Sequence, residues 1–207
     1  MSPRKLFLQS LLGIFILSLS SCIDLETRID LAQDGSGTLD LVYIVSSALV
    51  QLGSTASPGV SLPLPVEEQD LRDTVASVPG LTLRSYERTD EPEKRIIKAS
   101  LAFSSLSDVN ALFGGNETVI SQRQNGNDRV MEILIDPGKP GGLDPKTKEV
   151  AEAFFSNYSL KFHITLPQKV KRTNLEQSVV DGNTVQLTVP IVQVLEQETP
   201  LKWEIYW

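Results

Sequence analysis

Several groups that carry common protein chemistry are scarce in this sequence of 207 residues. It contains one cysteine, Cys22, and one histidine, His163. A single thiol excludes an intramolecular disulfide and any zinc site built from several thiolates. A single imidazole leaves one candidate for histidine-based acid–base catalysis. The classes of protein that depend on clusters of cysteine or histidine are therefore excluded.

Recognised catalytic motifs are also lacking. His163 lies between Phe162 and Ile164 in an alternating segment, so we expect it on the polar face of a strand, in contact with water. No Gly-x-Ser-x-Gly motif is present. The glycine-rich segment 138–142 lacks the Ser or Thr that follows the lysine of a phosphate loop. The acidic segment 90–93 is typical of a solvated turn. We predict no catalytic residue, no metal site and no cofactor.

No apolar run reaches the length of a membrane-spanning helix. The longest extends from Leu6 to Leu19, about 14 residues, whereas a helix that crosses a bilayer needs about 20. Arg4 and Lys5 precede this run and small residues follow it. A basic start, a short apolar middle and a small-residue end are the three parts of a secretion signal. We therefore predict that residues 1–21 are a signal peptide.

Cys22 directly follows this segment. The order Leu19-Ser20-Ser21-Cys22 resembles the lipobox of bacterial lipoproteins. The resemblance implies cleavage before Cys22 and attachment of acyl chains such as palmitate to it. Two or more chains hold a protein to a membrane almost permanently. We expect an extracytoplasmic protein of the cell envelope, anchored by lipid at Cys22, and the sequence leaves open which membrane and leaflet it occupies. A buried core cysteine is disfavoured at this place.

The remainder of the chain is acidic. Arg4 and Lys5 are the only charges of the predicted signal peptide, so its removal changes the formal net charge from −7 to −9. Such a charge repels nucleic acid at long range. We therefore expect the membrane, through the lipid, as a partner and expect no nucleic acid.

Hydrophobic periodicity predicts alternating strands and helices after Cys22. Period-two alternation predicts nine strands, over 23–31, 39–45, 81–88, 95–103, 117–123, 130–135, 160–166, 185–189 and 201–207. Helical spacing and terminal signals predict helices over 66–78, 107–113 and 145–155. Turn residues such as Asp34-Gly35-Ser36-Gly37 and Asn125-Gly126-Asn127 join strands into hairpins.

These elements predict an α+β fold. We expect a mostly antiparallel sheet built from hairpins, with two or three helices packed on one face. Residues 22–207 are predicted to form one extracytoplasmic domain. The Pro- and Gly-rich segment 136–145 leaves open an alternative, in which a second, all-β part begins there.

Two groups of residues are candidates for contact with a ligand. Trp203 and Trp207 close the sequence in an alternating segment, where they could cap a cavity, although their spacing also fits core packing. Lys169, Lys171 and Arg172 form a basic run that could contact phosphate headgroups, although a solvated loop is the favoured interpretation of them. These five side chains are the predicted ligand-binding residues.

Several short motifs together resemble the LppM-type bacterial lipoprotein domain. They are the strand directly after Cys22, Asp34-Gly35-Ser36-Gly37, the segment 162–167 leading to Asn174, and Asp181-Gly182-Asn183-Thr184-Val185. The resemblance implies a lipid-binding fold of mixed α and β structure and no catalytic residues. The mycobacterial member is implicated in glycolipid binding. Members often carry a hydrophobic segment beyond the domain, and this sequence shows none, so we expect no second membrane contact.

The sequence therefore predicts a lipid-anchored envelope lipoprotein that is not an enzyme and binds an amphiphilic ligand, a lipid or a glycolipid. A scaffold lipoprotein that binds another envelope protein is the main alternative. An envelope hydrolase that uses Asp or Glu is a third alternative. The sequence places no two carboxylates at a defined separation, so it assigns this hydrolase no catalytic pair.

Overall fold

The structure, a computed structural model, describes residues 23–47, 65, 67–113 and 118–207. The predicted signal peptide and Cys22 lie outside the described residues. The elements are β1 (Ile23–Leu31), β2 (Gly37–Ser46), α3 (Glu68–Ala76), β3 (Leu81–Asp90), β4 (Lys94–Phe103), α4 (Leu106–Leu112), β5 (Ile120–Asn125), β6 (Asp128–Asp136), α5 (Pro145–Phe155), β7 (Ser159–Thr165), β8 (Arg172–Thr173), β9 (Val179–Asp181), β10 (Thr184–Pro190), α6 (Ile191–Leu195) and β11 (Leu201–Tyr206).

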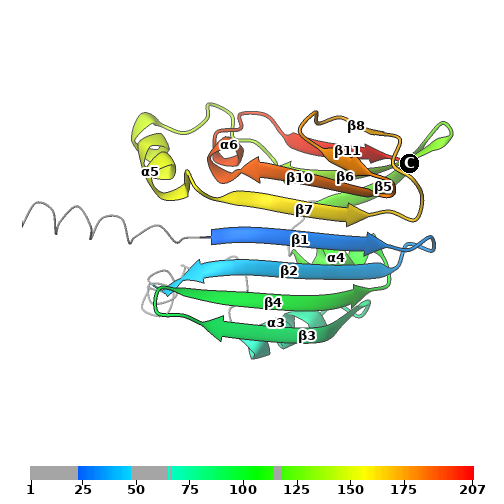
Figure 1. Ribbon diagram of the computed structural model, residues 1–207, viewed down its shortest axis with the longest axis horizontal. Helices are drawn as coiled ribbons and strands as arrows, with labels where there is room; N and C mark the ends of the chain where they lie inside the picture. The colour runs from blue at the N-terminus through cyan, green and yellow to red at the C-terminus, as the bar shows by residue number, and fades with distance from the viewer. Residues whose placement is uncertain (1–22, 48–64, 66, 114–117) are drawn as a thin grey trace, which may run out of the picture.

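The strands form two sheets (Figure 1). The larger has the order β3-β4-β2-β1-β7-β10-β9, and the smaller has the order β5-β6-β11-β8. The predicted α+β class with mostly antiparallel strands is confirmed, but the expectation of one sheet is wrong. A single open sheet of so many strands would twist strongly, and splitting into two packed sheets relieves this.

One pairing sets the centre of the larger sheet. β1 pairs antiparallel with β2 on one side and parallel with β7 on the other. Leu25 is opposite Leu160 and Asp30 is opposite Thr165. β1 and β7 therefore start at the same end of the molecule, which is the left end in Figure 1, while the last residue of the chain lies at the right end.

Two of the hairpins turn on a glycine with positive φ. Asn125 is opposite Asp128 and Asp181 is opposite Thr184, so Gly-Asn fills both two-residue turns. The φ angles of Gly126 and Gly182 are both 61°, and no non-glycine residue has positive φ in the described part of the chain. These turns therefore differ from the type I′ turn that an Asn-Gly pair would favour, which needs positive φ at both positions.

The larger sheet has one buried and one open face. Along β2, Leu39, Leu41, Tyr43 and Val45 are buried, while the residues between them are half-buried. The same alternation continues in β4. One hydrophobic cluster contains buried side chains from both sheets, with Trp203 of the smaller sheet fully buried. The core therefore lies between the sheets, and the polar alternating positions face away from it.

Four helices occur in the described residues, one more than the sequence predicted. α3 contacts β3, α4 contacts β4 and β5, and α5 contacts α6. The prediction missed α6 because its five residues, Ile191–Leu195, are mostly β-branched and apolar, a composition typical of a strand. None of the helices in the described ranges is both long enough and apolar enough to cross a membrane.

Candidate functional site

An apolar pocket lies where the two sheets and helix α4 meet. It has a volume of about 200 Å³. Among the described residues, twelve line the pocket, and all but Thr27 are hydrophobic: Leu25, Thr27, Ile29, Val109, Phe113, Val119, Ile120, Ile133, Leu134, Ile135, Leu160 and Phe162. Pockets that bind small molecules are typically lined mainly by apolar side chains, with few polar groups.

Strand β1 provides one wall through its alternation. Leu25, Thr27 and Ile29 are successive residues of its buried face. Leu160 and Phe162 extend this wall from β7, because Leu25 is opposite Leu160 and Thr27 is opposite Phe162 in the parallel pairing. The wall therefore depends on a pairing between two strands that are far apart in the sequence.

Helix α4 is fixed to the opposite wall by one side chain. The Asn110 amide donates to the Ile120 carbonyl at 2.7 Å and accepts from the Ile120 N–H at 2.8 Å. At the start of the helix, the Asp108 carboxylate accepts from the Ser105 N–H at 2.8 Å. These contacts hold Phe113, which follows the helix, at the pocket with 41% of its surface exposed.

The size of the pocket limits what it can hold. A cavity of about 150 Å³ lined by Leu, Ile and Phe binds benzene, and typical ligand pockets span about 300–1,000 Å³. At about 200 Å³, this pocket accommodates one ring or a short length of one acyl chain. The rest of any larger amphiphile would lie outside it.

The two predicted tryptophans lie in the core, in agreement with the packing alternative. Trp203 is fully buried and Trp207 is 2% exposed. The Trp203 indole N–H donates to the Ser178 hydroxyl at 3.0 Å, and its ring lies 6.1 Å from that of Phe162, between centroids. Trp203 thus supports the pocket through Phe162 and does not line it.

The predicted basic run is exposed but largely paired. The Lys171 ammonium lies 2.5 Å from the Asp128 carboxylate, and the Arg172 guanidinium lies 3.2 Å from the ring centroid of Tyr206. Lys169 is exposed, while Val170, between Lys169 and Lys171, is buried. Lys169, Lys171 and Arg172 therefore form a cationic surface that does not line the pocket. This surface adjoins β11, because the Lys171 N–H donates to the carbonyl of Tyr206, the residue before Trp207, at 2.7 Å.

A carboxylate close to this surface is stabilised in its charged form. A hydrogen bond from the Tyr206 hydroxyl, at 2.7 Å, and one from Arg123, at 2.6 Å, lower the pKa of Glu204. The charge of Glu204 therefore persists to lower pH and partly offsets the nearby cations.

The basic run and the pocket lie at different distances from Cys22. Leu25 is three residues after Cys22, a reach of about 10 Å. Asp30 is opposite Thr165, so residues 166–171 lie beyond the far end of β1, about 23 Å from Ile23 at the usual rise of a strand. The pocket is therefore the candidate site nearer to the predicted anchor.

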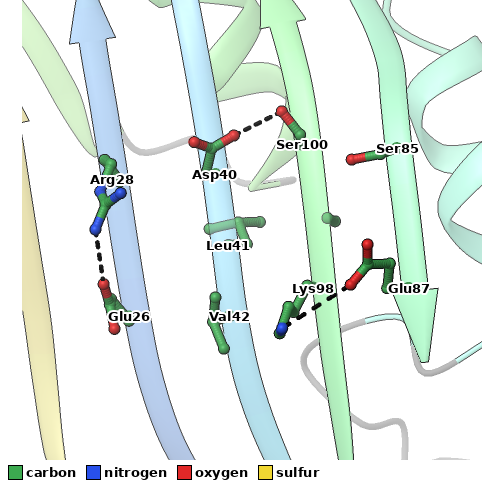
Figure 2. Close-up of a pocket in the computed structure, with 10 residues that line it drawn as sticks. Glu26, Arg28, Asp40, Leu41, Val42, Ser85, Glu87, Lys98 and Ser100 are labelled. Carbon is green, nitrogen blue, oxygen red and sulfur yellow. Dashed lines mark hydrogen bonds and ion pairs between the residues drawn. The ribbon is translucent and has the colours of Figure 1, made fainter. Parts of the chain in front are cut away.

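A second hollow lies on the open face of the larger sheet (Figure 2). Its volume is about 360 Å³, and its polar lining comes from β1, β2, β3 and β4. Figure 2 shows Arg28, Asp40, Ser100 and Ser85 across neighbouring strands. We call this hollow the polar groove. Its lining residues are Glu26, Arg28, Asp40, Leu41, Val42, Ser85, Glu87, Lys98, Ala99 and Ser100.

His163 lies on this polar face, as the sequence predicted. It is 26% exposed, and its Nε2 atom is 3.6 Å from the Glu26 carboxylate. Within the described ranges, no three His, Cys, Asp or Glu side chains come together as a metal site.

A scan against models of protein families and a search of curated proteins both find no match to this chain. The sequence did not predict the pocket, because its lining comes from five separate segments. The alternation of Leu25, Thr27 and Ile29 was the one available signal, and it identified a buried face without indicating what that face meets.

Proposed function

We propose that this chain is a lipid-anchored envelope lipoprotein that binds an amphiphilic ligand without chemistry, through the apolar pocket. The observation that carries the proposal is the nearly all-apolar lining of the pocket. The pocket begins at Leu25, close to the predicted lipid on Cys22, so a ligand embedded in the membrane would be within reach. The resemblance to the LppM-type domain, whose members have lipid-binding folds, points in the same direction.

The packing of the elements supports this proposal. We infer that α3 and α4 cover the same face of the larger sheet as the smaller sheet does. Val109 and Phe113 then close the pocket from the side of α4, while β5 and β6 close it from the smaller sheet. Only one ring or one chain end of the ligand would enter the pocket, because the volume of the pocket is only about 200 Å³.

Native mass spectrometry tests the proposal. The full chain, released from a nonionic detergent after incubation with a lipid extract of its own envelope, should retain a lipid. Leu160→Phe adds volume inside the pocket and should reduce the retained lipid several-fold. Leu83→Phe is the matched control, because Leu83 is also partly buried but lies on β3 outside the pocket. Equal retention by both variants, or no retained lipid, would contradict the proposal.

One observation favours the alternative of a protein partner. Val179 and Val180 of the edge strand β9 are 63% and 44% exposed. An exposed strand edge with apolar side chains can pair with another chain. Crosslinking in cells from a photoreactive residue at Val179 should capture one protein in stoichiometric amount if this function is correct, and only lipid or nothing if it is not.

A further inference from the structure

The polar groove has a floor of backbone and small side chains. The side chains of Leu41 and Ala99 are buried on the other face, so these residues line the groove with their main chain. Ser85 and Ser100 contribute only hydroxymethyl groups. Longer side chains surround this floor, which produces a hollow of about 360 Å³, within the range of small-molecule sites.

Two cations border the groove on either side of β2. Arg28 extends from β1 and Lys98 extends from β4, with 51% and 59% of their side chains exposed. Each has only a loose partner: the Arg28 guanidinium is 3.3 Å from Glu26 on the same strand, and the Lys98 ammonium is 3.9 Å from Glu87. Such exposed pairs are weak. An anionic group of a ligand can therefore replace these partners at little cost.

Asp40 supplies an acceptor between these cations. It is opposite Arg28 in the β1–β2 pairing, yet Arg28 turns to Glu26 and Asp40 accepts from the Ser100 hydroxyl at 2.6 Å (Figure 2). Within the described ranges, Asp40 has no ion pair. The second carboxylate oxygen, together with the hydroxyl of Ser85, can accept hydrogen bonds from an ammonium group.

We propose that the polar groove binds a small zwitterionic group that joins an ammonium to a phosphate, as phosphoethanolamine does. The phosphate would contact Arg28 and Lys98, and the ammonium would contact Asp40 and Ser85. Among the described residues, no aromatic side chain lines the groove, so they supply no stacking surface of the kind that sugar rings commonly use. The mixed charges favour a zwitterion over a simple anion or cation.

This site is independent of the apolar pocket. Residues alternate between the two faces of β1, so Glu26 and Arg28 point into the groove, while Leu25, Thr27 and Ile29 line the pocket. A small ligand in one site cannot contact the other. The failure of either proposal therefore leaves the other standing.

Binding should be weak and sensitive to salt, because Arg28 and Lys98 are exposed to water and Asp40 is only half-buried. We expect a dissociation constant of about 1 mM for phosphoethanolamine, weakened several-fold by a rise from low to high ionic strength. Titration calorimetry or NMR on the full chain in a nonionic detergent measures this constant.

Two pairs of variants test the residues. Asp40→Asn keeps an acceptor for Ser100 but removes the charge, and Arg28→Gln removes the cation. Each should weaken binding about fivefold or more. Asp30→Asn and Arg84→Gln make the same chemical changes at exposed positions of β1 and β3 outside the groove and should leave binding unchanged. Equal effects of groove and control variants would overturn the proposal.

Titrations with different ligands test which chemical group the groove binds and whether that group belongs to a lipid or to a soluble compound. Inorganic phosphate alone and ethanolamine alone should each bind several-fold more weakly than phosphoethanolamine, and equal binding by either would overturn the zwitterion assignment. Binding to phosphatidylethanolamine vesicles that Asp40→Asn weakens would identify a lipid headgroup as the source. Binding of free phosphoethanolamine without vesicle binding would identify a soluble compound. No saturable binding of either would overturn the proposal.

Discussion

The two buried tryptophans differ in the partner of their indole N–H. Trp203 donates to the Ser178 hydroxyl at 3.0 Å, whereas the N–H of Trp207 is buried with no acceptor among the described residues. Both rings fill the core to a similar extent. The comparison of the two positions therefore separates the contribution of one hydrogen bond from that of ring packing.

We expect Trp203→Phe to lower the free energy of unfolding more than Trp207→Phe, by about 1 kcal/mol. Both changes shrink a buried ring, but only the first removes a hydrogen bond and leaves a hydroxyl unpaired. Urea unfolding of the full chain, followed by circular dichroism, measures the difference. Equal losses for the two variants would show that the bond to Ser178 contributes nothing.

Residue-level prediction from the sequence succeeded where alternation alone decides the outcome. His163 lies on the polar face because its neighbours Phe162 and Ile164 are apolar. The roles of Trp203 and Arg172 depended on what lies opposite them. These partners are set by the pairing of β11 with β6 for Trp203, and of β8 with β11 for Arg172. Periodicity carries no information on such partners.

At the scale of elements, helix α3 is fastened to the sheet by a network of charges. The carboxylate of Glu67, just before the helix, lies 2.5 Å from Arg88 and 2.8 Å from Arg95. Asp90 contacts the same two arginines at 3.1 and 2.6 Å. Arg95 is only 18% exposed, so this network is less screened by water than most surface pairs.

Glu67→Gln should destabilise the protein by about 1 kcal/mol and increase hydrogen exchange in α3. Glu68→Gln is the control: it breaks a pair with Arg72 that lies within the helix and is about half exposed, so it should cost only about 0.4 kcal/mol. Hydrogen exchange of the α3 amides, measured by mass spectrometry, compares the two variants. If the two variants exchange alike, the network does not hold the helix to the sheet.

Hairpins were the elements that the sequence predicted best. β3 and β4 alternate and are joined by a short polar turn. The start of a helix was predicted equally well: α5 begins at Pro145 after Asp144, whose side chain accepts from the N–H groups of Lys146 and Thr147. These features are local. The parallel pairing of β1 with β7, the short strands β8 and β9 and the second sheet depend on contacts between distant segments, and the pocket depends on them too.

At the scale of the whole molecule, the ends of β1 define a near and a far end relative to Cys22. If Cys22 carries the lipid, the start of β7 lies near the bilayer and residues 166–171 lie about 23 Å further away. The cationic run would then point away from the membrane that holds the anchor, and the pocket would lie close to it.

Energy transfer to a membrane dye tests this orientation. Cys22 is the only cysteine and is expected to be lipidated, so a dye attaches only to an introduced cysteine. We expect Asn157→Cys to show stronger transfer than Lys169→Cys in the full chain. The additional change Cys22→Ala should abolish transfer at both positions. Equal transfer from both positions would mean that β1 lies parallel to the bilayer.

The direct start of β1 after Cys22 also has a mechanical consequence. A pull at Ile23 would load β1 along its own axis, between β2 and β7, with which it forms hydrogen bonds on both sides. Such a load shears two ladders of hydrogen bonds together, and their resistance adds, whereas peeling would break the bonds one at a time. If Cys22 is the anchor, tension on it would therefore be carried by the centre of the larger sheet.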